Sequence, residues 1–166
     1  MLILLRRVAA AFALIGAAVA LAAAVMVVTS IVLRALTTRP IQGDVELTQF
    51  AVAFAISLSL PWCQLRGANI IVDFFTQRLR ERNVRRLDAL GSVLIAAMCA
   101  LLAWRSAVGA LGVREATESS MILGLPMWWV YASLAPGLAL AALVALVQAW
   151  MHWNAQPMTR LTGEDA

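Results

Sequence analysis

The most regular feature of the chain is a succession of long apolar runs separated by short charged segments. Crossing the hydrocarbon layer of a bilayer takes about 20 residues of α-helix, at about 1.5 Å of rise per residue. Four runs reach that length, and the only charge inside them is Arg105, near the end of the third. The predicted spans are residues 8–33, 47–65, 89–110 and 126–151.

The pattern within these runs predicts helices. Backbone groups in lipid are satisfied only inside a helix or a closed barrel. The runs lack the alternation of apolar and polar positions that barrel strands show. We therefore expect one all-α integral membrane domain over residues 1–166. It should contain four transmembrane helices, plus an amphipathic interfacial helix between the second and third spans.

Composition supports the same class. The chain is 63% hydrophobic and only 13% charged, whereas soluble domains are about 45–50% apolar and about 25% charged. The mean hydropathy is +0.85 and the pI is near 10.4. In a soluble protein such a pI would favour a nucleic-acid partner. Here the arginines lie in short segments between spans, where they act as a topology signal, so no nucleic-acid partner is expected.

The first span has an alternative interpretation. The basic residues Arg6 and Arg7 precede it, and small apolar residues follow them, as in a secretion signal. The uncharged run, however, continues for 26 residues, over 8–33, while the core of a signal is about 7–15 residues long. A retained span with an arginine anchor on the inner side is therefore the favoured interpretation.

The distribution of arginine predicts the orientation. With the N-terminus inside, nine arginines fall on the inner side and four on the outer side. Positive charge favours the cytoplasmic side, so we expect an inner-membrane protein with both termini in the cytoplasm. The inner set is Arg6, Arg7, Arg160 and six within 66–86; the outer set is Arg34, Arg39, Arg105 and Arg114.

The segment RGANIIVDFFTQRLRERNVRR (66–86) combines six arginines with a short apolar centre. Residues 67–86 are predicted to form an amphipathic arm in the membrane interface, with arginines among lipid phosphates. Phe74 lies off the apolar stripe, which indicates contact with protein as well as lipid. The alternative is a cytoplasmic extension of the second or third span. One face carries Ala68, Ile71, Val72, Phe75 and Leu79 at helical spacing.

Residues with catalytic or ligand-binding chemistry are scarce. His152 lies between Trp150 and Trp153 at the end of the fourth span, which is typical of an interfacial aromatic belt. Cys63 and Cys99 are on different runs, without a CxxC pair, and are expected to be free thiols. The sequence contains no apparent metal cluster, phosphate loop or Ser/His/Asp set. We expect no enzyme activity and no cofactor in this chain.

Arg105 is the one charged residue inside a predicted span, about five residues from the end of the third. Charge at membrane depth is costly and marks functional positions. Two outcomes stay open. The side chain either extends outward to the interface or meets an acidic partner on another helix.

Several motifs, taken in order, resemble the small permease subunit of tripartite ATP-independent periplasmic (TRAP) transporters. The resemblance covers about residues 10–150. One departure is Asn69, where the family often has histidine, so no titrating role is carried over to that position. The matching features are Arg34 after the first span, Glu46 in GDVELTQF, Arg66 to Asp73 in RGANIIVD, and Ser120, Pro126, Pro136 and Gly137 around the last span.

The resemblance implies a large permease subunit that holds the substrate and sodium sites, and a periplasmic substrate-binding protein. This chain would be the scaffold for sodium-driven uptake of an organic acid such as a dicarboxylate. Alternatives are a small subunit of a tripartite tricarboxylate transporter, a membrane thiol–quinone oxidoreductase, and an autonomous channel or adaptor. The predicted interface residues are Arg34, Glu46, Arg66, Asp73, Phe74, Phe75 and Arg105.

Overall fold

The computed structural model describes residues 2–37, 41–66 and 81–154. In this part of the chain there are four helices, and each is long and apolar enough to cross a membrane. The prediction of four helices that are long and apolar enough to span a membrane is therefore confirmed. The helices are α1 (Leu2–Thr37), α2 (Asp44–Leu65), α3 (Glu81–Glu115) and α4 (Trp128–Trp153).

Two of the helices extend well beyond the predicted spans. α1 has 36 residues and α3 has 35, so each is about 50 Å long against a hydrocarbon thickness of about 30 Å. Arginine and glutamate are good helix formers, so both helices continue through charged residues past the apolar part. Residues 81–86, predicted as the end of the amphipathic arm, instead begin α3. The rest of the arm, 67–80, lies outside the described residues.

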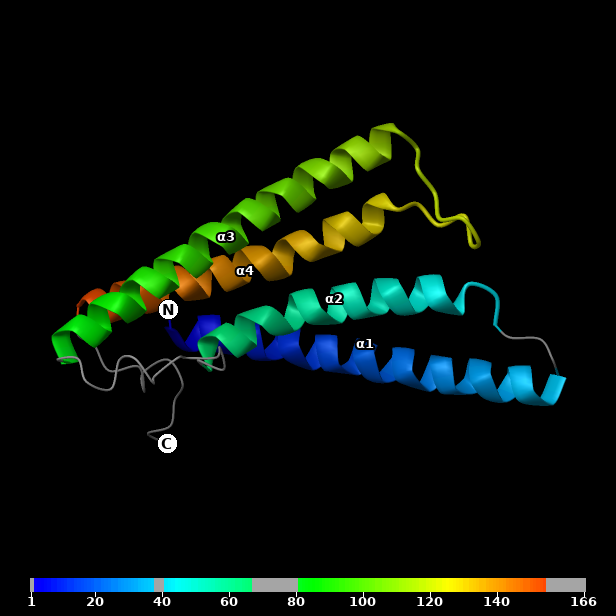
Figure 1. Ribbon diagram of the computed structural model, residues 1–166, viewed down its shortest axis with the longest axis horizontal. Helices are drawn as coiled ribbons and strands as arrows, with labels where there is room; N and C mark the ends of the chain where they lie inside the picture. Colours follow the sequence, from blue (N-terminus) through cyan, green and yellow to red (C-terminus); the bar gives the residue numbers. More distant parts are fainter. Residues whose placement is uncertain (1, 38–40, 67–80, 155–166) are drawn as a thin grey trace.

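The helices lie side by side in the order α1–α2–α4–α3 (Figure 1). α2 and α4 are the inner pair and meet along a seam, while α1 packs on the far side of α2 and α3 on the far side of α4. This order differs from the order in the sequence, because α4 is inserted between α2 and α3. The arrangement leaves α1 and α3 as edges with one extensively packed neighbour each.

Small residues make the contact between α1 and α2. The buried residues of α1 recur every seven positions, so they form one stripe along the helix. A Cβ added to Gly16 would lie only 2.9 Å from the Ala55 carbonyl oxygen. Small side chains of this kind allow close approach of membrane helices. The stripe consists of Ala9, Gly16, Ala23 and Ser30.

The seam between α2 and α4 is closest near its middle. The Ser57 hydroxyl donates a hydrogen bond of 2.8 Å to the Leu134 carbonyl oxygen. A Cβ on Gly137 would overlap the backbone and the side chain of Ser57, so only glycine fits there. α4 continues through Pro136 as one helix.

A pair of glutamines closes the seam at the opposite end from the α1–α2 and α3–α4 connections. The Gln64 Nε2 donates to the Gln148 Oε1 at 2.7 Å, and the Gln148 Nε2 donates to the Gln64 carbonyl oxygen at 2.7 Å. Both side chains are buried. Beside them Ala9, Leu65 and Val144 form a buried apolar cluster that joins α1, α2 and α4. Burial lets this reciprocal pair hold the two helices in one register.

Candidate functional site at the loop end

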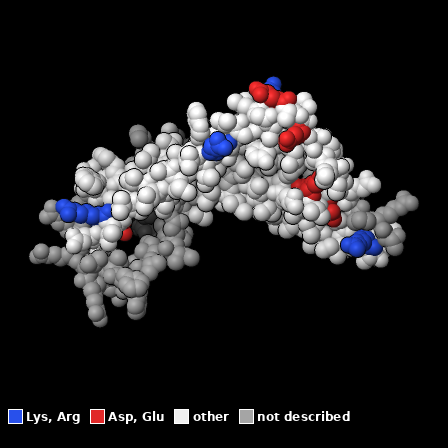
Figure 2. All heavy atoms as spheres, turned by 45° about the horizontal axis from the view of Figure 1, so that its top comes forward, with Lys and Arg blue, Asp and Glu red and all other residues white. Residues whose placement is uncertain are grey.

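The α1–α2 and α3–α4 connections lie at the same end of the molecule (Figure 1). We call this the loop end, and it comprises residues 41–46 and 115–127. Figure 2 shows acidic side chains gathered toward one end of a surface that is largely uncharged elsewhere. The described acidic residues of this end are Asp44, Glu46, Glu115 and Glu118.

Glu46 joins α2 to the α3–α4 loop (116–127). Its Oε1 accepts a hydrogen bond from the Ile122 N–H at 2.9 Å, and its Oε2 accepts one from the Leu123 N–H at 3.1 Å. A carboxylate makes stronger hydrogen bonds than a neutral acceptor does. Because Glu46 is in the first turn of α2, its negative charge also interacts favourably with the helix dipole. One side chain therefore fixes the tip of the loop.

The loop is shaped to present these two N–H groups. The Ser120 N–H donates to the Leu125 carbonyl oxygen at 2.8 Å, and the Ser120 hydroxyl oxygen accepts from the Leu125 N–H at 3.1 Å. Gly124 has φ +65°, a conformation that favours glycine. Gly43 also has positive φ, and a Cβ there would overlap the Leu123 side chain. Glycines at two positions thus permit the turn and its contact with α2.

A second carboxylate ties α1 to α2 at the same end. The Ser30 hydroxyl donates to the Asp44 Oδ2 at 2.6 Å and accepts from the Ile41 N–H at 3.3 Å. The Asp44 Oδ1 accepts from the Val45 N–H at 2.8 Å. Ser30 is buried, and these two hydrogen bonds satisfy its hydroxyl group. The Asp44 carboxylate thus serves to join the two helices.

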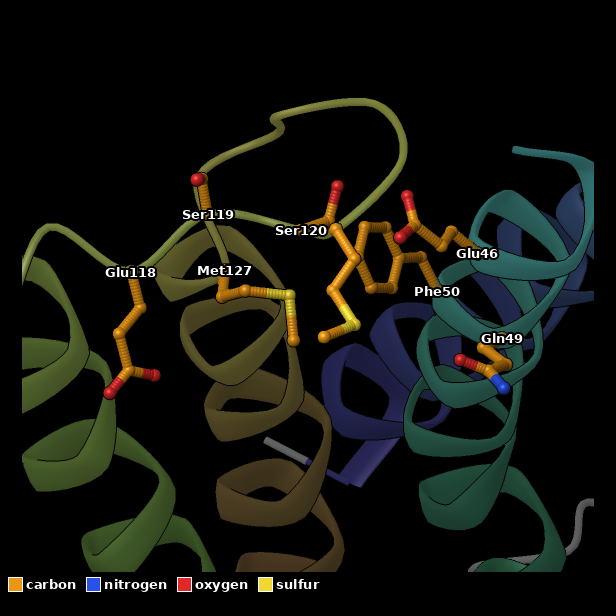
Figure 3. A pocket seen from close by; sticks show the side chains of 8 residues that line it. Glu46, Gln49, Phe50, Glu118, Ser119, Ser120 and Met127 are labelled. Carbon is orange, nitrogen blue, oxygen red and sulfur yellow. The ribbon is translucent and has the colours of Figure 1, made fainter. Parts of the chain in front are cut away.

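Between α2 and the α3–α4 loop lies a pocket of about 370 Å³ (Figure 3). Its walls combine carboxylates, hydroxyls and two methionines. Among the described residues no group of three His, Cys, Asp or Glu side chains could hold a metal ion. The lining residues are Glu46, Gln49, Phe50, Glu118, Ser119, Ser120, Met121 and Met127.

The tip of the loop exposes apolar side chains beside this pocket. Met121 is 99% exposed and Ile122 is 61% exposed, although the Ile122 backbone is held by Glu46. The loop end thus combines a fixed backbone, exposed apolar side chains and an acidic hollow next to them.

The predicted interface residues that the structure describes do not form one cluster. Arg34 is exposed in the last turn of α1, and in the described part of the chain no hydrogen bond joins it to Glu46. Arg66 caps α2 at the opposite end, with its guanidinium 5.1 Å from the centre of the Trp62 ring. The predicted candidates Asp73, Phe74 and Phe75 lie outside the described residues.

Arg105 faces outward from α3. Its side chain is exposed, and the neighbouring Trp104 is 69% exposed. Over residues 2–37, 41–66 and 83–154 the structure shows no carboxylate paired with Arg105. An acidic partner within this part of the chain is therefore not found.

Several functional contacts were not anticipated from the sequence. The contact between Gln64 and Gln148 would have been the easiest to predict. Each residue has an amide side chain in an otherwise apolar run, and such groups pair between membrane helices. The bonds of Glu46 had no comparable signal, since its partners are backbone N–H groups of Ile122 and Leu123.

Comparison with known families gives one match. The family described as "Tripartite ATP-independent periplasmic transporters, DctQ component" matches residues 23–155, which is most of the chain. No curated protein and no solved structure matches the chain. The matched family is a transporter component and not a class of enzymes, and it is the family that the sequence motifs resemble.

Proposed function

Because the chain belongs to the DctQ-component family of tripartite ATP-independent periplasmic transporters, we propose that it is a static scaffold for its transporter. In this proposal it supports a large permease subunit during sodium-driven uptake of an organic acid, such as a dicarboxylate, delivered by a periplasmic binding protein. The observation that carries the proposal is the row of four helices, in which α2 is fastened by polar contacts to α4 at one end and to the α3–α4 loop at the other.

The polar groups inside the spans support this role. Ser57, Gln64 and Gln148 are buried and bond across the seam. Buried polar groups that satisfy one another make an interface specific and rigid. These side chains join helix to helix, which is the behaviour expected of a frame.

The row also provides surfaces for partners. A single layer of helices leaves two broad faces and two edges that lipid or another membrane subunit covers. At the loop end, Met121 and Ile122 project from a loop whose backbone is held by Glu46. With both termini in the cytoplasm, this end faces the periplasm, where a binding protein would meet it.

The function is tested by reconstitution. Proteoliposomes holding this chain and its large permease subunit, supplied with the binding protein, should accumulate the organic acid when a sodium gradient is imposed. Liposomes holding either membrane subunit alone should not. Solute uptake by this chain without its companion would contradict a scaffolding role.

The orientation is tested separately by thiol labelling. Cys63 and Cys99 are replaced by alanine, and a cysteine is introduced at the fully exposed Met121. A membrane-impermeant maleimide should label this variant in intact spheroplasts. A cysteine at Arg7, near the N-terminus, should be labelled only after the membrane is opened. The reverse pattern would invert the proposed topology.

We also propose that the basic segment 66–86, whose last residues begin α3, anchors the scaffold at the cytoplasmic face. The support is its sequence, in which Phe74 and Phe75 lie between basic residues. Replacing both phenylalanines with aspartate should abolish uptake or assembly, because charge is unfavourable at the acyl boundary. Thr76→Asp, on the predicted polar face, is the matched control and should retain both. Unchanged sodium-driven uptake in the double variant would eliminate the anchor.

A further inference from the structure

We propose that the outer face of α3 is the surface on which the large permease subunit docks, through a membrane helix that places a carboxylate against Arg105. This inference rests on the proposed scaffolding function and adds the face and the recognising residue. α3 is an edge of the row, with α4 as its extensively packed neighbour, so its far side is free to receive a helix (Figure 1).

α3 carries two opposite stripes with a spacing of seven residues. One stripe is buried in the structure and contains Ala89, Ala96 and Ala110. The other begins two residues later, about 200° around the helix, and therefore points away from α4. It consists of Gly91, Met98, Arg105 and Gly112.

The two glycines of the outer stripe have no helix packed against them. A Cβ added to Gly91 or Gly112 would meet nothing within 4 Å. In contrast, Gly16 and Gly137 lie where a neighbouring helix approaches closely. Glycine in a membrane helix permits such close approach. The outer stripe of α3 thus has the small residues of a helix contact without a partner in the described part of the chain.

Arg105 supplies the charge that selects the partner. It lies nine residues before Arg114 in a stretch, 89–113, that has no other charged residue, which places its Cα about 13 Å from Arg114 along the helix. Each Cα–Cβ bond in a helix tilts toward the helix N-terminus. The Arg105 side chain therefore initially points away from residue 113, which is the nearer end of this uncharged stretch. A carboxylate on a docked helix would satisfy the guanidinium at that depth, with paired hydrogen bonds.

The other edge of the row lacks these features. The exposed large side chains of α1 in residues 8–33 are aliphatic, for example Leu14, Leu21 and Val28, and this stretch has no charge. Such a surface is suited to lipid tails. The difference favours α3 over α1 as the docking edge.

Cross-linking tests the position of the interface. A photoreactive amino acid is placed at Met98 on α3, or at Leu21 on α1 as the control, in the full chain coexpressed with its large permease subunit. Illumination should yield a covalent adduct with the large subunit from position 98 and none from position 21. Adducts from position 21 alone would overturn the inference while leaving the scaffold function standing. Failure of the unaltered subunits to copurify would overturn both.

Substitution tests the recognising residue. Arg105→Ala should lower recovery of the large subunit by roughly tenfold or more, while Arg105→Lys, which keeps the positive charge, should retain much of it. Gly112→Leu should also reduce recovery, although the open space at this position leaves the thermal stability of the isolated chain unchanged. Full recovery with both Arg105→Ala and Gly112→Leu would refute docking on this face. Loss of stability in isolated Gly112→Leu would also count against it, because the face would then be occupied within the chain.

Discussion

The two helical hairpins, α1–α2 and α3–α4, are held together differently at the two ends of the molecule. At one end Gln64 and Gln148 exchange two hydrogen bonds between buried groups. At the loop end Glu46 holds two backbone N–H groups of an exposed loop. The first contact fixes one helix against another in a dry environment, and the second fixes a loop against a helix next to water.

The difference has a physical basis. In an apolar environment an amide must find a partner, and a second amide provides a donor and an acceptor without a net charge. A carboxylate is costly at that depth but is readily solvated at a membrane boundary. The buried pair therefore determines helix register, whereas the exposed contact controls the shape of a surface loop. The following substitutions test that division, in order of decreasing expected effect.

Gly137→Ala should have the largest effect, because it acts on the seam that both contacts require. The new Cβ would overlap the Ser57 backbone, and overpacking costs about 1–3 kcal/mol, with the upper end expected against backbone. The free energy of unfolding, measured by denaturant titration in micelles, should fall by about 3 kcal/mol. Gly112→Ala on α3 is the matched control and should be neutral or slightly stabilising. Equal stability of the two variants would mean that α2 and α4 are not closely packed.

Gln148→Leu should have an intermediate effect. It removes both hydrogen bonds to Gln64, and interhelical bonds of this kind contribute about 1–2 kcal/mol to stability. The same titration should show this loss. The double variant Gln64→Leu/Gln148→Leu should lose less than the sum of the single variants, because the two residues act as a unit. Strict additivity would contradict the proposed pairing.

Glu46→Ala should have the smallest effect on global stability and a clear local effect. The Ile122 and Leu123 N–H groups lose their acceptor, so their hydrogen exchange should become several-fold faster. Glu118→Ala is the control, since Glu118 lines the same pocket without accepting from these amides. Exchange can be followed by mass spectrometry of the peptide containing 118–127. An unaltered rate in Glu46→Ala would show that the loop holds its shape without this contact.

The spans were predictable from sequence because their physical cause is local. A long uncharged run, such as residues 8–33, is sufficient to specify a membrane helix. The order of the helices in the row was not predictable, since it depends on which faces fit together. The close approach of Gly137 to Ser57 becomes apparent only when both helices are in place.

The candidate site was predictable only in part. Glu46 was predicted as an interface candidate, and the structure places it at the loop end. Its hydrogen-bond partners were not predicted, because every residue except proline has a backbone N–H and the sequence does not mark which one is used. Arg105 was recognised as unusual from its depth alone. Its outward direction follows from the packing of α3 on α4, which a single sequence does not specify.

The placement of α4 between α2 and α3 has a consequence for biosynthesis. The helices form two hairpins, α1–α2 and α3–α4, which meet along the seam between α2 and α4. Of the four helices, α4 is synthesised last. The first hairpin has its own contacts as soon as it is inserted. α3 has no extensively packed neighbour until α4 is inserted. Until then, its alanine stripe faces lipid or the insertion machinery. Ser57 and Gln64 of α2 also gain their partners across the seam only when α4, the last of the four helices, is in place.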